Sequence, residues 1–170
     1  MTWRVVLIGL GSNRGDSRRI VLEAMARMNA FARGEVHRSG LWRTSPVDCP
    51  PGSGDFINAA VAFEAKEGLS PEGLLMALKA LEREYGRNAT PVRNAPRELD
   101  LDLLLFNDET RETEQFTLPH PRAVNRLFVL SPAAEVLPDA EWPGTGKTIR
   151  GLLDALKSDE VVRRLEGEAV

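Results

Sequence analysis

The sequence predicts an α+β protein with a ferredoxin-like βαββαβ core, a mainly antiparallel sheet, and an extra strand and helices at the C-terminal end. Three observations lead to this prediction. Strand-like and helix-like stretches follow one another in the order β-α-β-β-α-β. The length of 170 residues suits one domain with a sizeable core. No internal repeat or linker divides the chain, so residues 1–170 are expected to form a single domain.

The first half of the pattern is a strand, a helix and a second strand. Val5–Leu10 is an apolar, β-rich run typical of a buried strand. Turn-forming residues follow it, namely Gly11, Ser12, Asn13 and Gly15. Asp16 or Ser17 then caps a helix that Gly34 ends. Its apolar face consists of Val21, Met25, Met28 and Ala32. Residues 35–44 read as the second strand.

The second half is a strand, a helix and a strand between two irregular stretches. Residues 56–65 form the third predicted strand, after a proline- and glycine-rich stretch at 45–54. Ser70-Pro71-Glu72 is a strong helix start, and the apolar face that follows is Leu74, Leu78, Leu81 and Tyr85. An irregular stretch at 87–96 precedes the fourth strand at 97–106. Further elements are expected near 114–118 (strand), 121–136 (helix) and 148–157 (helix).

The fourth strand places two like charges side by side. Because side chains alternate along a strand, one face is all leucine, namely Leu99, Leu101, Leu103 and Leu105. The other face reads Glu98, Asp100, Asp102, Leu104 and Phe106. Repulsion and desolvation disfavour neighbouring carboxylates at the edge of a core. A divalent cation such as Mg²⁺ relieves both costs, whereas an ordinary solvated carboxylate pair is the plain alternative.

Cationic residues gather on both sides of this strand in the sequence. They are Lys79, Arg83, Arg87, Arg93, Arg97, His120, Arg122 and Arg126. Each alone is explained as a solvated surface charge. Together with a magnesium site and glycine- and proline-rich loops, they indicate a polyphosphate ligand, because phosphoryl transfer needs mainly positioning and charge neutralisation. The residues themselves therefore predict a Mg²⁺-dependent transferase that uses a nucleotide.

Two stretches resemble phosphate-binding loops without meeting their requirements. "GTGKT" at 144–148 ends like a Walker A loop. However, the motif requires a glycine five positions before Gly146, where this chain has Glu141, and no strand is predicted before the stretch. It is better explained as a turn before a helix. "GLGSNRG" at 9–15 lacks the third glycine of the dinucleotide fingerprint, since that position is Arg14. Its glycines are interpreted as turn formers.

Composition excludes several other classes. The net charge of −3 and the aromatic content of 6% argue against a nucleic-acid-binding protein. The single cysteine, Cys49, and the two distant histidines, His37 and His120, argue against a disulfide framework or a zinc site. No apolar run approaches the length of about 20 residues that spans a bilayer. We expect a cytoplasmic monomer without a membrane partner.

Six stretches together resemble one enzyme family. They are "GLGSNRGD", "WRTSP", "DFINAAVAF", "LEREYGR", "PRELDLDLLLF" and "LPHPRAVNRLFVLSP", in this order between Val5 and Pro138. In them the chain resembles the 6-hydroxymethyl-7,8-dihydropterin pyrophosphokinases of folate biosynthesis. That resemblance implies a ferredoxin-like α+β fold, in agreement with the order of elements above. Its substrates would be ATP and 6-hydroxymethyl-7,8-dihydropterin.

The resemblance also implies a reaction. ATP would donate its two terminal phosphates as a unit to the pterin hydroxymethyl oxygen, which attacks the β-phosphorus in line, and AMP would leave. Asp100 and Asp102 match the aspartates that hold two Mg²⁺ ions, one between the α- and β-phosphates and the other between β and γ. Arg87 and Arg97 match arginines that engage the polyphosphate. Further nucleotide contacts would come from Glu82, Thr117, His120, Arg126 and the backbone at Leu103.

The same resemblance assigns a pterin site. Asn58 matches the residue whose amide hydrogen-bonds the ring edge, and Phe56 and Phe128 would supply stacking surface. Backbone groups at Thr44, Ser45 and Val47 would contact and recognise the pterin ring. Without the resemblance, core packing explains the two phenylalanines equally well.

The chain departs from the family pattern at several positions near the nucleotide. Ala89 stands where a second arginine is usual, Asn94 and Ala95 replace an aromatic residue and a glycine, and Lys79 replaces a glutamine. The loop at 87–96 is therefore expected to close differently over ATP. Arg93 is the candidate to supply the missing charge.

Two other classes of function compete with the enzyme. One is a ligand-binding regulatory domain of ferredoxin-like fold, which would not need the paired aspartates, the arginines and Asn58 together. The other is a catalytically silent relative, which Ala89 favours but the retained Asp100, Asp102 and Arg97 oppose.

Overall fold

The computed structural model describes residues 5–13, 16–44, 55–86, 99–158 and 160–165. The strands are β1 (Val6–Ser12), β2 (His37–Arg38), β3 (Trp42–Thr44), β4 (Phe56–Phe63), β5 (Asp100–Phe106), β6 (Arg111–Glu112), β7 (Thr117–Leu118), β8 (Glu141–Trp142), β9 (Lys147–Thr148) and β10 (Val162–Arg164). The helices are α1 (Ser17–Arg27), α2 (Pro71–Glu84), α3 (Leu127–Val136) and α4 (Ile149–Ala155), with short 3-10 helices η1 (Met28–Phe31) and η2 (Ala123–Asn125).

One antiparallel sheet organises these elements. Its strands lie in the order β10-β3-β4-β1-β5, and β2 also pairs with β4. Each neighbouring pair is antiparallel. The prediction of a mixed α and β fold around an antiparallel sheet is confirmed.

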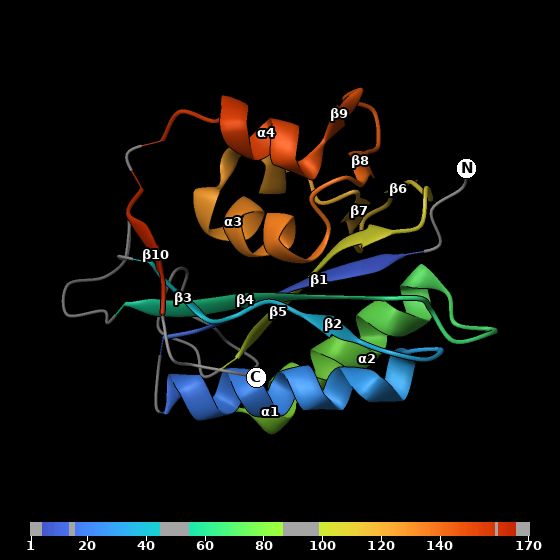
Figure 1. Ribbon diagram of the computed structural model, residues 1–170. Coiled ribbons are helices and arrows are strands. Elements are labelled where there is room, and N and C mark those ends of the chain that lie inside the picture. The colour runs from blue at the N-terminus through green and yellow to red at the C-terminus, as the bar shows by residue number, and fades with distance from the viewer. Residues whose placement is uncertain (1–4, 14–15, 45–54, 87–98, 159, 166–170) are drawn as a thin grey trace.

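Helices cover both faces of the sheet, as Figure 1 shows: α1 and α2 lie on one face, and α3 and α4 lie on the other. The first face buries a core of α1, α2 and sheet residues that includes Val21, Met25 and Leu78. The second face buries a separate core that includes Leu7, Ala62 and Leu130. Because both faces carry apolar side chains, the central strands β1 and β4 are buried on both sides.

The two long helices begin as their caps predict. The Asp16 carboxylate accepts a hydrogen bond from the Arg19 N–H at 3.3 Å, and the Ser70 hydroxyl accepts one from the Gly73 N–H at 3.0 Å. The predicted end of α1 is wrong. The α-helix stops at Arg27 and continues only as η1 to Phe31, before Gly34 is reached.

The second predicted strand is not continuous. It is divided into β2 and β3, although the Ser39 N–H still donates to the Ala60 carbonyl of β4 at 2.9 Å. The Ser39 hydroxyl takes the place of a backbone partner there, since it accepts from the Ala60 N–H at 2.8 Å and donates to the Gly40 carbonyl at 2.7 Å. The third strand ends at Phe63, two residues earlier than predicted.

The C-terminal part contains more short strands than the sequence predicts. The single strand expected near 114–118 is a hairpin of β6 and β7. The helix expected over 121–136 is η2 followed by α3, and the last helix is α4. "GTGKT" is indeed a turn before a helix, but β8 and β9 flank that turn. No helix in the described ranges is long and apolar enough to cross a membrane.

A bulge in β5 corrects the predicted alternation of its side chains. Leu7 pairs with Leu105 and Ile8 pairs with Leu103, so Leu104 is an extra residue in the ladder. Leu104 and Leu105 therefore both pack in the core beneath α3. Leu99, Leu101, Leu103 and Phe106 pack on the opposite face, against α1 and α2. The expectation that Leu105 shares the face of the other three odd-numbered leucines is wrong.

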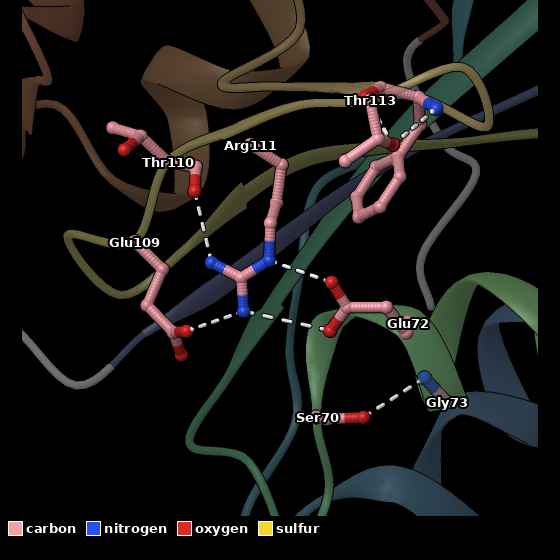
Figure 2. Close-up of polar contacts among 8 residues, drawn as sticks. Ser70, Glu72, Gly73, Glu109, Thr110, Arg111 and Thr113 are labelled. Carbon is pink, nitrogen blue, oxygen red and sulfur yellow. Dashed lines mark hydrogen bonds and ion pairs between the residues drawn. The ribbon is translucent and has the colours of Figure 1, made fainter.

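An arginine fastens the segment after β5 to α2, as Figure 2 shows. The Arg111 guanidinium donates through Nε to Glu72 at 2.6 Å and through Nη2 to Glu109 at 2.8 Å. Hydrogen bonds from Arg111 lower the pKa of the Glu72 carboxyl. These hydrogen bonds tie β6 and the turn before it to the start of α2.

Candidate active site

Two adjoining cavities meet at β5, the strand at the end of the sheet. The first, of about 250 Å³, lies over β1, β4 and β5 and is closed by residues of the segment 122–129. The second, of about 410 Å³, lies between β5, α2 and the segment 120–126. The boundary between them is formed by the residues that line both, namely Asp100, Asp102, Arg122 and Arg126.

The floor of the first cavity, the side formed by β1, consists of backbone without side chains. Gly9 and Gly11 lie within β1, opposite Asp102 and Asp100 on β5. A Cβ atom on Gly11 would stand 2.9 Å from the Asn58 Oδ1 atom, closer than real Cβ atoms approach. The interpretation of these glycines as turn formers is wrong, because β1 continues through Gly11 to Ser12. Their lack of side chains keeps the space between Asn58 and the aspartates open.

Asp100 and Asp102 point to the same face, as the alternation predicts, and both are half-buried. No group of three or more acidic, histidine or cysteine residues that would hold a metal occurs among the described residues. Two carboxylates nevertheless suit Mg²⁺, which takes one or two from the protein and completes its shell with water and phosphate oxygens. The donor set therefore fits a magnesium ion that arrives with a phosphate ligand.

Glu82 supports the strand that carries the aspartates. Its side chain is 2% exposed, and its Oε2 atom accepts a hydrogen bond from the Leu101 N–H at 2.8 Å. Leu101 lies between the two aspartates, so this carboxylate fixes β5 at that point. Glu82 also lines the second cavity.

His120 lies in the second cavity as a neutral imidazole. Burial lowers its pKa, the positive charges of Arg126 and Arg122 lower it further, and Asp100 opposes them. The Arg122 N–H donates to His120 Nδ1 at 3.3 Å, which requires an unprotonated Nδ1 atom and leaves the proton on Nε2. The His120 N–H donates to the Leu104 carbonyl at 3.0 Å, which attaches the segment to β5.

Two arginines face the two aspartates across the cavity boundary. The Arg126 guanidinium lies 5.5 Å from the centre of the Phe128 ring, within range of a cation–π interaction. Arg122 belongs to the cations around the acidic strand that the sequence associates with a polyphosphate ligand, but the family resemblance gives it no role of its own. The structure places it at the boundary of the two cavities.

Asn58 is held from the neighbouring strand. Its Nδ2 atom donates to the Thr44 hydroxyl at 2.7 Å, and both side chains are buried, at 5% and 4% exposure. Asn58 lines the first cavity together with Phe56 and Phe128, which are half-buried. The structure thus brings the predicted pterin residues of β3, β4 and α3 to one place.

Other predicted residues are not at the cavities or lie outside the described part. Thr117 is exposed on β7 and Leu103 packs in the core beneath α2, and neither lines these cavities. Lys79 lines the second cavity. The predictions that fall outside the described residues are those for Ser45, Val47, Arg87, Ala89, Arg93, Asn94, Ala95 and Arg97.

Comparisons with known proteins show the family of the chain. Residues 7–138 match the model of the 7,8-dihydro-6-hydroxymethylpterin-pyrophosphokinase (HPPK) family. The chain is 42% identical over 142 residues to a 2-amino-4-hydroxy-6-hydroxymethyldihydropteridine pyrophosphokinase of Bacillus subtilis, covering 83% of each chain. It is 38% identical over 148 residues to a protein of the same name from Synechocystis, covering 87% of this chain and 74% of the relative.

Solved structures show the same fold in more distant proteins. HPPK-DHPS of Plasmodium falciparum, solved with pteroate, matches with a TM-score of 0.67 at 14% sequence identity. The match covers 88% of this chain and 44% of that chain, so the present chain spans less than half of the larger protein. At this identity the likeness is one of fold.

Proposed function

The chain belongs to the 7,8-dihydro-6-hydroxymethylpterin-pyrophosphokinase family, and from this premise we propose that it transfers pyrophosphate from ATP to the hydroxymethyl group of 6-hydroxymethyl-7,8-dihydropterin. Proteins of this family are pyrophosphokinases of folate biosynthesis, that is, ATP-dependent transferases. AMP is the second product.

One observation carries the proposal: two cavities share a boundary of two carboxylates and two guanidinium groups. A transfer between two substrates needs a site for each and a common point at which the transferred group is bound. The first cavity, with Asn58 and two phenylalanines, suits a flat heterocycle that carries both donors and acceptors. The second, lined by Lys79, His120 and the two arginines, suits a triphosphate.

The reaction proceeds by in-line attack of the pterin hydroxymethyl oxygen on the β-phosphorus of ATP. The bond between the hydroxymethyl oxygen and the β-phosphorus forms, and the bond between the β-phosphorus and the oxygen shared with the α-phosphorus breaks. AMP leaves with that oxygen, and the hydroxyl proton passes to water. No side chain acts as a nucleophile. Magnesium, bound as two ions by Asp100 and Asp102, would neutralise the triphosphate and increase the acidity of the hydroxyl group.

The protein's own side chains position the phosphates and neutralise their negative charge. Arg122 and Arg126 bind phosphate oxygens at the boundary, and His120 donates from Nε2 as a neutral imidazole. Glu82 holds β5 so that both aspartates face the phosphates. Arg87 and Arg97 remain proposed polyphosphate contacts on the grounds of the motif alone.

On the pterin side, the Asn58 amide is proposed to bind the ring edge. Its bond to Thr44 fixes the amide plane, so that the carbonyl oxygen and the remaining N–H are presented in one orientation. Phe56 and Phe128 supply stacking surface on the two sides of the cavity. Ser45 and Val47 remain proposed backbone contacts.

We also assign the core to the ferredoxin-like arrangement. The strand order β3-β4-β1-β5, with α1 and α2 on one face, supports this assignment. In this arrangement the opposite face is available for ligands, and the aspartates lie on it.

The direct test is to incubate the protein with Mg²⁺, ATP and the reduced pterin and to measure AMP. We expect AMP to form only when all three are present. If the pterin binds but no AMP appears, the ligand-binding regulatory domain is the better description. If neither substrate binds, the protein is better described as a catalytically silent relative.

A further inference from the structure

The end of the described chain reaches the pterin side of the site from outside the region that matches the family model, which stops at residue 138. Strand β10 pairs with β3, so β3 has a neighbour on each side. The Leu165 N–H also donates to the Leu41 carbonyl at 2.8 Å, and Leu165 is buried. A strand of three residues with one partner is marginal, so β10 is a substantial part of what holds β3 in place.

The strand registers form one row of residues across the sheet. Arg164 lies opposite Trp42, Trp42 opposite Asn58, Asn58 opposite Gly11, and Gly11 opposite Asp100. Directly opposite residues in antiparallel strands project to the same face. The row therefore leads from the C-terminal strand, through the proposed pterin residue, to a proposed magnesium ligand.

Glu135, which lies on α3, forms hydrogen bonds with one end of this row. Its carboxylate accepts hydrogen bonds from the Gly40 N–H at 3.2 Å, from the Trp42 indole N–H at 3.0 Å and from the Arg164 guanidinium at 2.9 Å. Burial opposes its ionisation, but these donors outweigh burial and lower the pKa of Glu135. A Cβ atom at Gly40 would stand 2.5 Å from Arg164 Nη2, so the contact depends on glycine there.

The other end of α3 is held by the same C-terminal segment. The Glu160 carboxylate accepts from the Leu127 N–H at 3.2 Å, in the first turn of α3. The next two residues, Phe128 and Val129, line the first cavity. The sheet side of that cavity, where β4 carries Asn58 and pairs with β3, is thus joined to the start of α3 through Glu135 and Glu160.

We propose that Glu135 is a positioning residue for the pterin: it sets the distance between the sheet wall, with Asn58 and Thr44, and the α3 wall, with Phe128. The inference rests on the proposed function. Because Asp100 and Asp102 are held separately, by β1 and Glu82, loss of Glu135 acts mainly on the pterin and leaves the two aspartates in place.

The test replaces Glu135 with alanine and with glutamine and measures steady-state AMP release. For Glu135→Ala we expect the KM for the pterin to rise by about tenfold, while the KM for ATP stays within about twofold. Glu135→Gln, which keeps an acceptor for Trp42 and Gly40, is expected to recover part of the loss. The pterin Kd, measured by the fluorescence of the pterin itself, is expected to rise in parallel.

Glu72→Ala is the matched control, because it also removes a carboxylate paired with an arginine, but one remote from both cavities. It is expected to leave both KM values unchanged. The proposal is overturned if Glu135→Ala and Glu72→Ala alter the kinetics alike, or if Glu135→Ala raises both KM values equally. If Glu135→Ala does not fold, the Glu135→Gln values decide. AMP formation by the unaltered protein tests the proposed function separately.

Discussion

At the scale of single residues, the aspartates carry the sharpest prediction. Asp100→Ala or Asp102→Ala is expected to lower AMP release by at least about a hundredfold, because each carboxylate would hold magnesium against the phosphates. Folding is expected to be hardly affected, since loss of one carboxylate relieves repulsion from the other. AMP release and thermal unfolding measure the two effects. A variant that keeps more than about a tenth of the activity contradicts the assignment.

Gly11→Ala tests the bare floor of the first cavity. The new Cβ atom would displace the Asn58 side chain, so we expect the KM for the pterin to rise by about tenfold or more. Gly9→Ala is the control on the same strand, because its Cβ would meet only the end of the Leu104 side chain, at 3.4 Å. Equal kinetics for the two variants would show that displacement of Asn58 is not the cause.

Arg122→Ala tests the arginine to which the family resemblance assigns no role. We expect kcat/KM for ATP to fall by about tenfold or more, because a charged contact to phosphate is lost at the boundary of the cavities. Arg122→Lys is expected to recover part of the rate. Arg38→Ala, on the exposed strand β2, serves as the control. An unchanged rate for Arg122→Ala removes this residue from the site.

Much of the site follows from the sequence, for a physical reason. Alternation along a strand is enough to place Asp100 and Asp102 on one face, and the motifs select Asn58, Phe56 and Phe128, which the structure brings to the same cavity. The role of Gly9 and Gly11 as the floor of the cavity could not be predicted from the sequence, because it depends on which strands flank β1. The role of Arg122 depends in the same way on where the segment after β7 returns to the sheet.

At the scale of elements, the long helices and long strands were predictable and the short strands were not. Caps and apolar faces mark α1 and α2 locally. Strands β6 to β10 have two or three residues each, too few to show alternation, and they exist because of their tertiary partners. The bulge in β5 is hidden for another reason: residues 103–105 are all leucine, so the pattern fits either register.

The contact between α3 and β3 predicts a dependence on pH. The pKa of Glu135 is lower in the folded protein than in the unfolded chain, so its contribution to stability is present above the unfolded pKa of about 4.3 and is lost as the pH falls through the folded value. We expect Glu135→Gln to be less stable than the unaltered protein at pH 7 and the difference to shrink near pH 3. Urea unfolding at both pH values measures it. A difference that does not depend on pH contradicts the prediction.

At the scale of the whole molecule, two helical layers enclose the sheet unequally. The layer of α1 and α2 buries one face, and α3 and α4 lie on the other (Figure 1). The first cavity opens on the α3 face, and the second extends past β5 to α2, so the site surrounds the end of the sheet at β5. Its floor belongs to β1, β4 and β5, and segments from distant parts of the sequence form its walls.

This arrangement predicts that nucleotide and metal stabilise the molecule jointly. ATP with Mg²⁺, at about a hundred times its Kd, is expected to raise the thermal midpoint by about 5–10 °C. ATP with a chelator is expected to raise it far less, because the aspartates repel a triphosphate without a cation between them. Differential scanning fluorimetry compares the two. Equal shifts would mean that the nucleotide binds independently of the metal.

The bulge at Leu104 also restricts how the length of β5 can change during evolution. If one of the three consecutive leucines were deleted, the ladder with β1 would become regular, and Phe106 and the two aspartates would keep their faces. If a residue were deleted elsewhere in β5, one half of the strand would have to turn over, so that Phe106 left the core beneath α1 and α2 or an aspartate pointed into it. Deletions within β5 in functional descendants should therefore be confined to one of residues 103–105, and other changes in length should fall in the turn after it, at residues 107–110.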